Sequence, residues 1–353
     1  MDILKLEVPN NMKAVKMAKI YARPRQRLEQ VVPLEAPFSV QLDVCSACNM
    51  KCSFCFHSDL EAIEREHVRF GMMDYALFTK IIDDMRAGWG RAKVKKLRLF
   101  KVGEPLLNPN LCKMVEYAKK SEVAECIEIT TNGTLLDKEM SYGLIKAGVD
   151  ILNISVNGIN ERQYENTCQY KMDFQRFRDN IAFFYENRKD CKLYIKYSDI
   201  GYSKDEKDSF YQLFGDICDS IFVENILSDL WQETKAGKEV VNTGSSMYGE
   251  KMKDKNVCPF LFTTMVINDK GVVHLCCVDW MSRYILGDLK KENICDIWNG
   301  GGVREYQKMH LSNKKNSIEI CKNCVSLSGS TIDDIDDYAE IILERIEKRE
   351  LNK

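Results

Sequence analysis

Residues 38–55 read FSVQLDVCSACNMKCSFC, a short β-strand pattern that runs straight into three closely spaced cysteines, Cys48, Cys52 and Cys55. A cube of four iron atoms takes four ligands, which are normally cysteine thiolates. Three thiolates so close together can bind three of the irons and leave the fourth open for another ligand. The loop is therefore a candidate site for an iron–sulfur cluster that takes part in catalysis as well as electron transfer.

The composition is that of a globular protein with a large core. The chain has 353 residues, 45% of them hydrophobic, and a net charge of −2 from 51 basic and 53 acidic residues. This length fits one large domain or two unequal ones, and the even mixture of charges predicts neither a nucleic-acid nor a membrane partner. The N-terminus has no apolar signal region, so we expect a cytoplasmic protein. An odd count of 15 cysteines favours reduced thiols available to metal over a disulfide framework.

Short apolar strands alternate with helical stretches in the first two thirds of the chain. The expected strands cover residues 38–44, 96–101, 127–131, 151–156, 192–198 and 220–226. The expected helices cover about 74–87, 109–120, 137–147, 172–188 and 205–217, with starts at Asp74, at Asn108 before Pro109 and at Asp137, and a stop at Gly148. Repeated β/α order demands a parallel sheet with right-handed crossovers. Six units predict an α/β fold, a partial (β/α)6 barrel of the TIM type, with function at the C-terminal ends of its strands.

These residues resemble the radical S-adenosylmethionine (radical SAM) superfamily from about residue 37 to residue 325. The family's signature has three cysteines spaced as Cys48, Cys52 and Cys55, with an aromatic residue before the last, here Phe54. The resemblance implies a barrel over residues 37–226 that binds a [4Fe–4S] cluster through these cysteines and S-adenosylmethionine (SAM) at the open iron. It also implies that reductive cleavage of SAM gives a 5′-deoxyadenosyl radical that abstracts hydrogen from the substrate. An external reductant such as flavodoxin or ferredoxin is then expected.

Further segments resemble those that border SAM in the family. LFKVGEPLLNP resembles the glycine–glutamate–proline segment after the second strand, although Lys101 and Val102 stand where an earlier glycine is usual. ITTNGTLL and NISVNG resemble the segments at the third and fourth strands, with Asn157 where Asp is frequent. The SAM contacts implied by the resemblance are Phe54, Gly103, Glu104, Pro105, Thr131, Asn132, Asn153, Ser155 and Lys196. His57 lies just beyond the last cluster cysteine, where it either faces the substrate or lies on a solvated loop.

A second group of cysteines lies near the C-terminus. Residues 262–268 and 272–276 are expected to form a hairpin around the turn Asp269-Lys270-Gly271, which brings Cys276 near Cys258. The CKNC segment then adds Cys321 and Cys324. Four such cysteines fit either structural zinc or an iron–sulfur cluster. Because adjacent residues on a strand face opposite ways, Cys276 and Cys277 are not expected to bind the same metal centre.

The C-terminal segment also resembles the twitch or SPASM extension of radical SAM proteins. The resemblance implies a small α+β domain over residues 227–325 with one auxiliary [4Fe–4S] cluster, bound by Cys258, Cys276, Cys321 and Cys324. The chain would then hold two clusters. Cys45, Cys277 and Cys295 are not among the expected cluster ligands. Residues 1–36 are expected to be a lead-in, and residues 326–353 an amphipathic helix that packs on the barrel.

Three classes of function follow from these expectations. The first is a radical SAM oxidoreductase that oxidises a sugar, an aminocyclitol or a similar small molecule, with the auxiliary cluster as electron acceptor. The second is a radical SAM epimerase or peptide-modifying enzyme, for which Cys168, Cys218 and Cys277 are candidate hydrogen donors. The third is a non-catalytic zinc or iron–sulfur scaffold.

Overall fold

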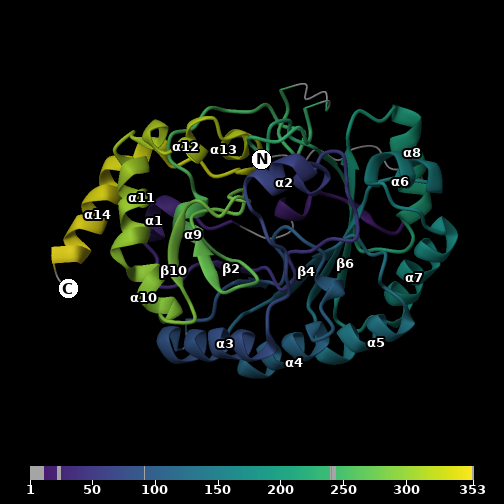
Figure 1. The fold of residues 1–353 in the computed structure, drawn as a ribbon, viewed down its shortest axis with the longest axis horizontal. Helices are drawn as coiled ribbons and strands as arrows, with labels where there is room; N and C mark the ends of the chain where they lie inside the picture. The colour runs from purple at the N-terminus through teal and green to yellow at the C-terminus, as the bar shows by residue number, and fades with distance from the viewer. Residues whose placement is uncertain (1–11, 22–24, 91, 239, 241–243, 352–353) are drawn as a thin grey trace.

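A curved, mostly parallel sheet forms the centre of the computed structural model, and helices cover its outer side (Figure 1). The structure describes residues 12–21, 25–90, 92–238, 240 and 244–351. Among these residues the sheet has ten strands in the order β1-β7-β6-β5-β4-β3-β2-β8-β9-β10. The six expected strands are its parallel middle, which confirms the partial barrel: β2 (Ser39–Leu42), β3 (Lys96–Arg98), β4 (Ile127–Thr131), β5 (Ile151–Val156), β6 (Lys192–Asp199) and β7 (Ser220–Asn225).

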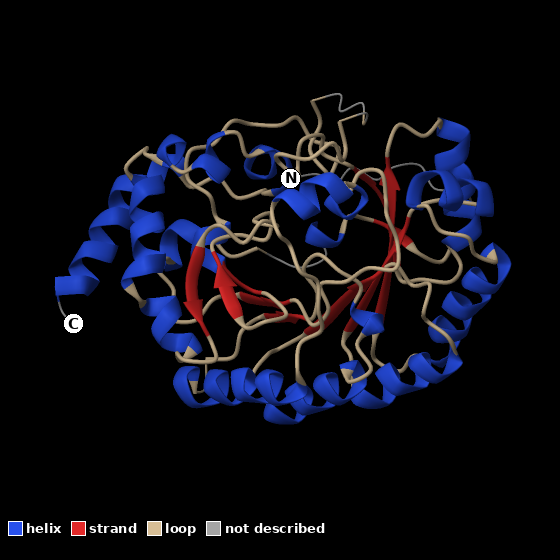
Figure 2. Ribbon diagram, viewed as in Figure 1, coloured by secondary structure: helices blue, strands red, loops and turns tan. Residues whose placement is uncertain are grey.

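The five expected helices are present and lie outside the strands, as Figure 2 shows in blue and red. Asp74 and Asp137 cap helices as predicted, because their side chains accept backbone N–H groups of the first turn. Gly148 ends its helix with a φ of +87°, in the left-handed region that favours glycine. The helices are α3 (Tyr75–Trp89), α4 (Leu111–Ser121), α5 (Lys138–Ala147), α7 (Phe174–Asn187) and α8 (Lys204–Phe214).

Two features of this region differ from the sequence prediction. Helix α4 begins at Leu111, two residues later than expected, because Asn108 is tied into the preceding loop by bonds from its Nδ2 to the carbonyls of Val44 and Met73. Helix α6 (Glu161–Cys168) was not predicted, since its sequence ERQYENTC has too few apolar residues to show a helical period. Its start is fixed by Asn160, whose side chain accepts the backbone N–H of Gln163.

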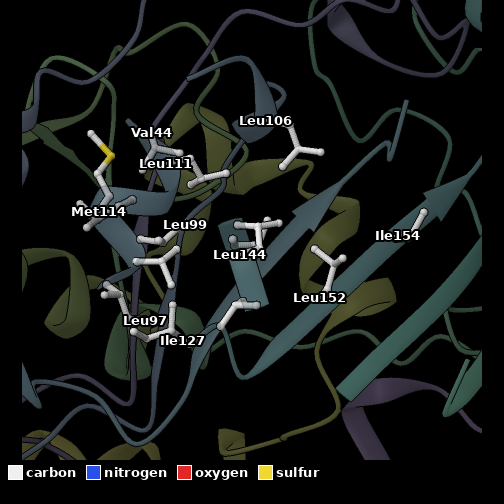
Figure 3. Close-up of a cluster of buried hydrophobic side chains, with 14 of the residues drawn as sticks. Val44, Leu97, Leu99, Leu106, Leu111, Met114, Ile127, Leu144, Leu152 and Ile154 are labelled. Atoms are coloured by element: carbon white, nitrogen blue, oxygen red, sulfur yellow. The ribbon is translucent and has the colours of Figure 1, made fainter. Parts of the chain in front are cut away.

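The core lies between the sheet and the outer helices. Alternate residues of the strands point outward, as Leu97 on β3 and Leu152 on β5 do, and pack against α4 and α5 (Figure 3). The side chains in this layer are almost fully buried, and each contributes about 1.5–3 kcal/mol to stability. The other alternate positions face the inside of the barrel, and several of these are charged or polar.

The C-terminal hairpin continues the barrel sheet. Strand β8 (Thr264–Ile267) pairs in parallel with β2, while β9 (Val272–His274) and β10 (Ile285–Asp288) follow in antiparallel order. The expected turn is confirmed, and Gly271 has a φ of +82° there. Both predicted strands were too long, because residues 260–263 form helix α9 (Phe260–Thr263) and β9 ends at His274. At the opposite edge, β1 (Val15–Lys16) of the lead-in pairs with β7.

The prediction of one helix over residues 326–353 was wrong in its first half. Helix α13 (Val325–Ser330) ends early, and α14 (Ala339–Leu351) starts only after an extended stretch. Carboxylates in this stretch are held by other segments: Asp333 pairs with Arg25, and Asp336 accepts the backbone N–H groups of Asn256 and Val257. Helix α14 packs on α11 (Gly301–Leu311) and on the lead-in helix α1 (Leu28–Val31), whereas the barrel was the predicted partner.

The remaining described helices are short. They are α2 (Leu60–Arg65), α10 (Ile294–Asn299) and α12 (Glu319–Lys322), together with 3-10 turns such as Lys19–Tyr21 and Phe56–Ser58. Helix α10 is followed directly by α11, which begins at the glycines after it. None of the described helices has the length and apolar composition needed to cross a bilayer.

Candidate functional site

The cysteine loop after β2 is held in place by the end of helix α6. The backbone N–H of Lys51 donates to the carbonyl of Cys168 at 2.9 Å, and that of Ser53 donates to the carbonyl of Thr167 at 2.8 Å. These bonds satisfy two carbonyls that are left without helical partners at the end of α6. The helix that the sequence did not reveal therefore fixes the backbone on both sides of Cys52.

One polar side chain lies against each of the three cysteine sulfurs, and two of these side chains come from the loops after β4 and β5. Nitrogen donors near cluster sulfurs influence the reduction potential of a bound cluster and orient its ligands. The structure therefore provides neighbours for the ligands as well as the ligands. The pairs are Asn132 Nδ2 and Cys48 Sγ (3.9 Å), Asn157 Nδ2 and Cys52 Sγ (3.7 Å), and His57 Nδ1 and Cys55 Sγ (3.3 Å).

His57 does not lie on a solvated loop, so that expectation was wrong, while its contact with substrate stays a prediction. It is buried, and its Nε2 lies 3.0 Å from the carbonyl oxygen of Ser46. The ring also stacks on Phe70, with 4.7 Å between the ring centroids. His57 therefore packs the inner side of the cysteine loop against its neighbours.

The cysteines of this loop are protonated when no metal is bound. Burial raises the pKa of Cys48 to about 12 and also raises the pKa of Cys55. For Cys52 the largest cause is a hydrogen bond with the thiol of Cys168, which raises its pKa further. Because iron binds thiolates, assembly of a cluster must release these protons, and its affinity will rise with pH.

Glu104 ties the loop after β3 to the loop after β4. Its buried carboxylate accepts hydrogen bonds from Thr131 Oγ1 at 2.6 Å, from the backbone N–H of Asn132 at 2.7 Å and from the backbone N–H of Leu106 at 2.9 Å. Its own backbone N–H donates to the carbonyl of Ala47 at 2.8 Å. Burial raises the pKa of Glu104 to about 7, although the three donors oppose the shift. The side chain of Glu104 thus joins two other residues expected to border SAM, Thr131 and Asn132.

Gly103 is required by close packing. A Cβ atom at this position would lie 2.1 Å from the carbonyl oxygen of Cys45 and 2.6 Å from that of Ala47. No real Cβ contact is that short, so the segment can pass the cysteine loop only with glycine here. The close approach is made despite Lys101 and Val102, which replace the glycine that is usual before this segment.

The inside of the barrel contains a cavity of about 600 Å³. Asn153 on β5 and Lys196 on β6, both expected to contact SAM, line it. Lys196 is paired there with Glu224 on β7, with 2.5 Å between Nζ and Oε2. Ser155 lies beside Lys196 in the register of β5 and β6. The cavity therefore reaches two of the residues that are expected to contact SAM.

The four C-terminal cysteines expected to bind the second cluster pack against the same hydrophobic cluster. Beyond the effect of burial, the charges of Cys324 and Cys321 raise the pKa of Cys258, and those of Cys258 and Cys324 contribute to the raised pKa of Cys276. Such effects act over short distances, so the four thiols form one group. A four-iron cube takes four thiolates, and this group supplies that number.

Both cysteine groups offer the ligand type and number that a four-iron cluster takes. In a four-iron cube each thiolate binds its own iron, so the sulfurs do not need to converge on one point. The residues present therefore fit one cluster in the loop after β2 and a second at the C-terminal hairpin.

The argument that separated Cys276 from Cys277 was wrong. It assumed a strand through Cys276, but β9 ends at His274 and the two thiols hydrogen-bond to each other. That bond raises the pKa of Cys276 and lowers that of Cys277. Cys277 also lies close enough to Arg98 and Lys101 for their charges to lower its pKa.

The other two candidate hydrogen donors lie outside the cavity. Cys168 is fully buried against Cys52, and Cys218 is fully buried with its Sγ donating to the carbonyl of Phe214. Neither lines the cavity inside the barrel. Cys277 does not line the cavity either, but the charge of Arg98, which does line it, lowers the pKa of Cys277.

Sequence analysis missed Asp43, which follows β2 at the end of the barrel. Both of its carboxylate oxygens are buried and have no hydrogen-bond partner among the described residues. Burial raises its pKa to about 7, although the nearby charge of Lys101 opposes the shift. The backbone N–H groups of Val102 and Gly103 also lower this pKa, but by less than burial raises it.

We expect Asp43→Asn to stabilise the protein increasingly as pH rises. The folded pKa near 7 exceeds the unfolded value, so the wild type loses stability between about pH 4 and pH 7 and the loss is complete above pH 7. The variant avoids this loss and should be more stable by about 2–4 kcal/mol at pH 8 and by much less at pH 5. Urea denaturation of reconstituted protein at both pH values measures this, with the exposed Asp208→Asn as control. A difference that does not change with pH would show that Asp43 is already paired.

Two family models match the chain. The Radical SAM superfamily model matches residues 43–197, which include the cysteine loop, and the SPASM iron–sulfur cluster-binding domain model matches residues 258–325, which include the second cysteine group. Over 125 residues the chain is 34% identical to GTP 3′,8-cyclase of Chlorobaculum tepidum, covering 35% of this chain and 34% of the relative. Over 116 residues it is 37% identical to the tungsten-containing aldehyde ferredoxin oxidoreductase cofactor-modifying protein of Pyrococcus furiosus, covering 33% and 30%. The chain thus spans about a third of the length of these relatives.

Solved structures share the fold at low sequence identity. BtrN in complex with AdoMet and 2-DOIA has a TM-score of 0.55 at 18% identity, covering 85% of this chain and 98% of BtrN. Streptococcus suis SuiB bound to its precursor peptide SuiA has a TM-score of 0.60 at 13% identity, covering 78% and 67%. AnSMEcpe with bound AdoMet has a TM-score of 0.59 at 15% identity, covering 90% and 94%. Because the matched regions carry the two cysteine groups described above, residues 43–197 belong to the radical SAM superfamily and residues 258–325 to the SPASM iron–sulfur cluster-binding domain, which imply two [4Fe–4S] clusters and SAM as cofactors.

Proposed function

We propose that this protein is a radical SAM oxidoreductase that oxidises a small, polar metabolite of the sugar or aminocyclitol type. The observation that carries the proposal is the cavity inside the barrel, which is lined by expected SAM contacts and by many charged side chains. Its volume of about 600 Å³ is typical of sites for small molecules. The aromatic rings of Phe100, Tyr194 and Phe222 complete its walls.

The chain's own residues would bind and orient the cofactors. Cys48, Cys52 and Cys55 would hold the SAM cluster, and the loops joined by Glu104 would form the wall beside SAM. When bound, the cofactors supply a radical that takes hydrogen from the substrate and an acceptor for the second electron. The protein's part is to place the substrate carbon next to SAM and to keep water away.

The position of the second cysteine group supports oxidation. Strand β8 pairs directly with β2, so the hairpin before Cys276 is part of the barrel wall. Lys101, after β3, also donates from Nζ to the carbonyl of Asp279 beyond that hairpin, at 3.3 Å. A cluster held there lies close to the cavity, which suits an electron acceptor in a two-electron oxidation. BtrN, whose structure contains 2-DOIA, shares this fold.

The test is turnover by anaerobically reconstituted full-length protein with dithionite. We expect 2-DOIA, a simple sugar or a sugar phosphate to stimulate 5′-deoxyadenosine formation, with one SAM consumed per ketone formed. A substrate deuterated at the carbinol carbon should pass its label to 5′-deoxyadenosine. Incorporation of solvent deuterium into the recovered substrate would instead show an epimerase, and stimulation only by peptides, such as the precursor bound by SuiB, would show a peptide-modifying enzyme. Absence of 5′-deoxyadenosine under every condition would leave the scaffold function.

A further inference from the structure

Three cations surround one buried carboxylate on the inner face of the barrel. Glu128, on β4, is fully buried and pairs with Lys19 of the lead-in. Lys96 and Arg98 of β3 approach it from the other side, with Lys96 Nζ at 3.3 Å and Arg98 Nε at 3.8 Å from its carboxylate oxygens. Three positive charges against one negative charge leave an excess of about two positive charges at this point.

The guanidinium of Arg98 keeps N–H donors that form no hydrogen bond in this arrangement. Its Nε is buried and has no hydrogen-bond partner among the described residues, because 3.8 Å to Glu128 is too long for a hydrogen bond. The guanidinium carries five donors, and no hydrogen bond from any of them to a described residue is seen. Unused donors beside a cavity are places where a ligand oxygen gains a bond at no cost to the fold.

The pKa of the neighbouring lysine responds to the same charges. Burial lowers the pKa of Lys19 to about 8, and the positive charges of Arg98 and Lys96 lower it further, while Glu128 opposes the shift. The lysine is still largely charged at pH 7. The other close ion pairs at the cavity are balanced one to one, Lys196 with Glu224 and Arg25 with Asp333. The surplus is therefore local to Lys19, Lys96 and Arg98, which we call the cation triad.

The cation triad and Glu128 line the same cavity as the expected SAM contacts Asn153 and Lys196. Lys96 begins β3, and in the sheet register Arg98 lies beside Glu128, which lies beside Ile151 at the start of β5, whereas the cysteine loop follows the C-terminal end of β2. The cavity thus has the radical-forming cofactor expected at one end and an unbalanced positive charge at the other. A substrate that spans the two would present its reacting carbon to SAM and an anionic end to the cation triad.

We propose that the cation triad binds a phosphate ester of the substrate, so that this enzyme acts on a phosphorylated small polyol. A phosphate monoester carries about −1.5 to −2 charges at pH 7, which matches the surplus. The planar guanidinium of Arg98 can bind two phosphate oxygens at once, and Lys96 adds a point charge. The reaction proposed above supplies the context, but binding of the phosphate does not depend on turnover.

Binding by reconstituted, SAM-loaded full-length protein tests the proposal, with D-glucose 6-phosphate, D-glucose and D-gluconate as calorimetric probes. We expect the phosphate ester to bind at least about tenfold more tightly than the neutral sugar or the carboxylate, since bonds to a charged group are the strong ones. Arg98→Met should lower phosphate affinity by about tenfold or more. Glu128→Gln should raise it, because removing the one negative charge increases the surplus.

Lys171→Gln is the matched control, because Lys171 is an exposed lysine paired with Glu165 outside the cavity. It should bind the phosphate ester as the wild type does. Equal affinity for the three probes, or an effect of Lys171→Gln as large as that of Arg98→Met, would overturn the proposal. The opposite sign expected for Glu128→Gln separates the proposal from a simple loss of folding in Arg98→Met. If phosphate binds in this pattern but no 5′-deoxyadenosine forms, the proposed reaction fails and the anion site remains.

Discussion

Replacing Cys52 with alanine is expected to abolish SAM cleavage. The loop offers three cysteines for a cube that needs one ligand on each iron, and a cube held by two thiolates in this loop is not stable. We expect 5′-deoxyadenosine formation to fall by about a hundredfold or more, and iron to fall from about eight to about four atoms per chain. Iron analysis and electron paramagnetic resonance of the reconstituted variant measure the second effect independently of turnover.

The matched control is Cys112→Ala. Cys112 is half-buried on α4, and its Sγ lies 3.8 Å from the sulfur of Met140, outside both cysteine groups. This variant should keep about eight iron atoms and its full rate of SAM cleavage. If Cys52→Ala also kept about eight iron atoms, the loop would not hold the first cluster, and a different set of cysteines would have to be sought.

The strands could be predicted because their outward positions are apolar. Leu97, Ile129 and Leu152 lie at such positions, and short apolar runs between helical stretches are typical of the buried strands of a parallel sheet. The extended stretch between α13 and α14 could not be predicted. The sequence after residue 331 has a helical pattern, but its carboxylates form contacts with distant segments in place of a helix. Arg25 and the backbone of Asn256 hold carboxylates that would otherwise lie in the first turns of the helix.

The cysteines of the site could be predicted, whereas their surroundings could not. Cys48, Cys52 and Cys55 lie within eight residues, so their spacing alone points to a shared metal centre. The side chains against their sulfurs come from separate loops, and only the folded barrel brings them together.

The sequence contains a signal for the charged group formed by Glu128 and two members of the cation triad. Lys96, Arg98 and Glu128 occupy positions of β3 and β4 that face away from the apolar core. Charge at inward positions of a barrel strand marks a cavity, where the charge is satisfied by pairing or by a ligand. The pairing partner Lys19 lies on the lead-in, far away in the sequence, so only the folded chain shows how many charges meet there.

Replacing Glu104 with leucine should damage both stability and SAM binding. The change leaves Thr131 Oγ1 and the N–H groups of Leu106 and Asn132 buried without an acceptor. Each such group costs about 1–3 kcal/mol, so even after relief of the buried charge we expect a loss of about 2–5 kcal/mol. The exposed Glu116→Leu on α4 should change stability by less than about 0.5 kcal/mol.

The effect on SAM arises because Glu104 positions Asn132, which reaches the first cluster cysteine. Besides its contact with Cys48 Sγ, Asn132 donates from Nδ2 to Oδ1 of Asn49 at 2.8 Å, so this loop and the cysteine loop are bound to each other. Glu104→Gln keeps the size of the side chain but replaces one acceptor oxygen with an NH₂ donor. This donor must face one of the N–H or O–H groups that now donate hydrogen bonds to Glu104. We therefore expect Glu104→Gln to fold better than Glu104→Leu and still to bind SAM at least about tenfold more weakly than the wild type. Equilibrium dialysis with SAM on the reconstituted variants measures this, and a Gln variant with wild-type affinity would limit Glu104 to a role in stability.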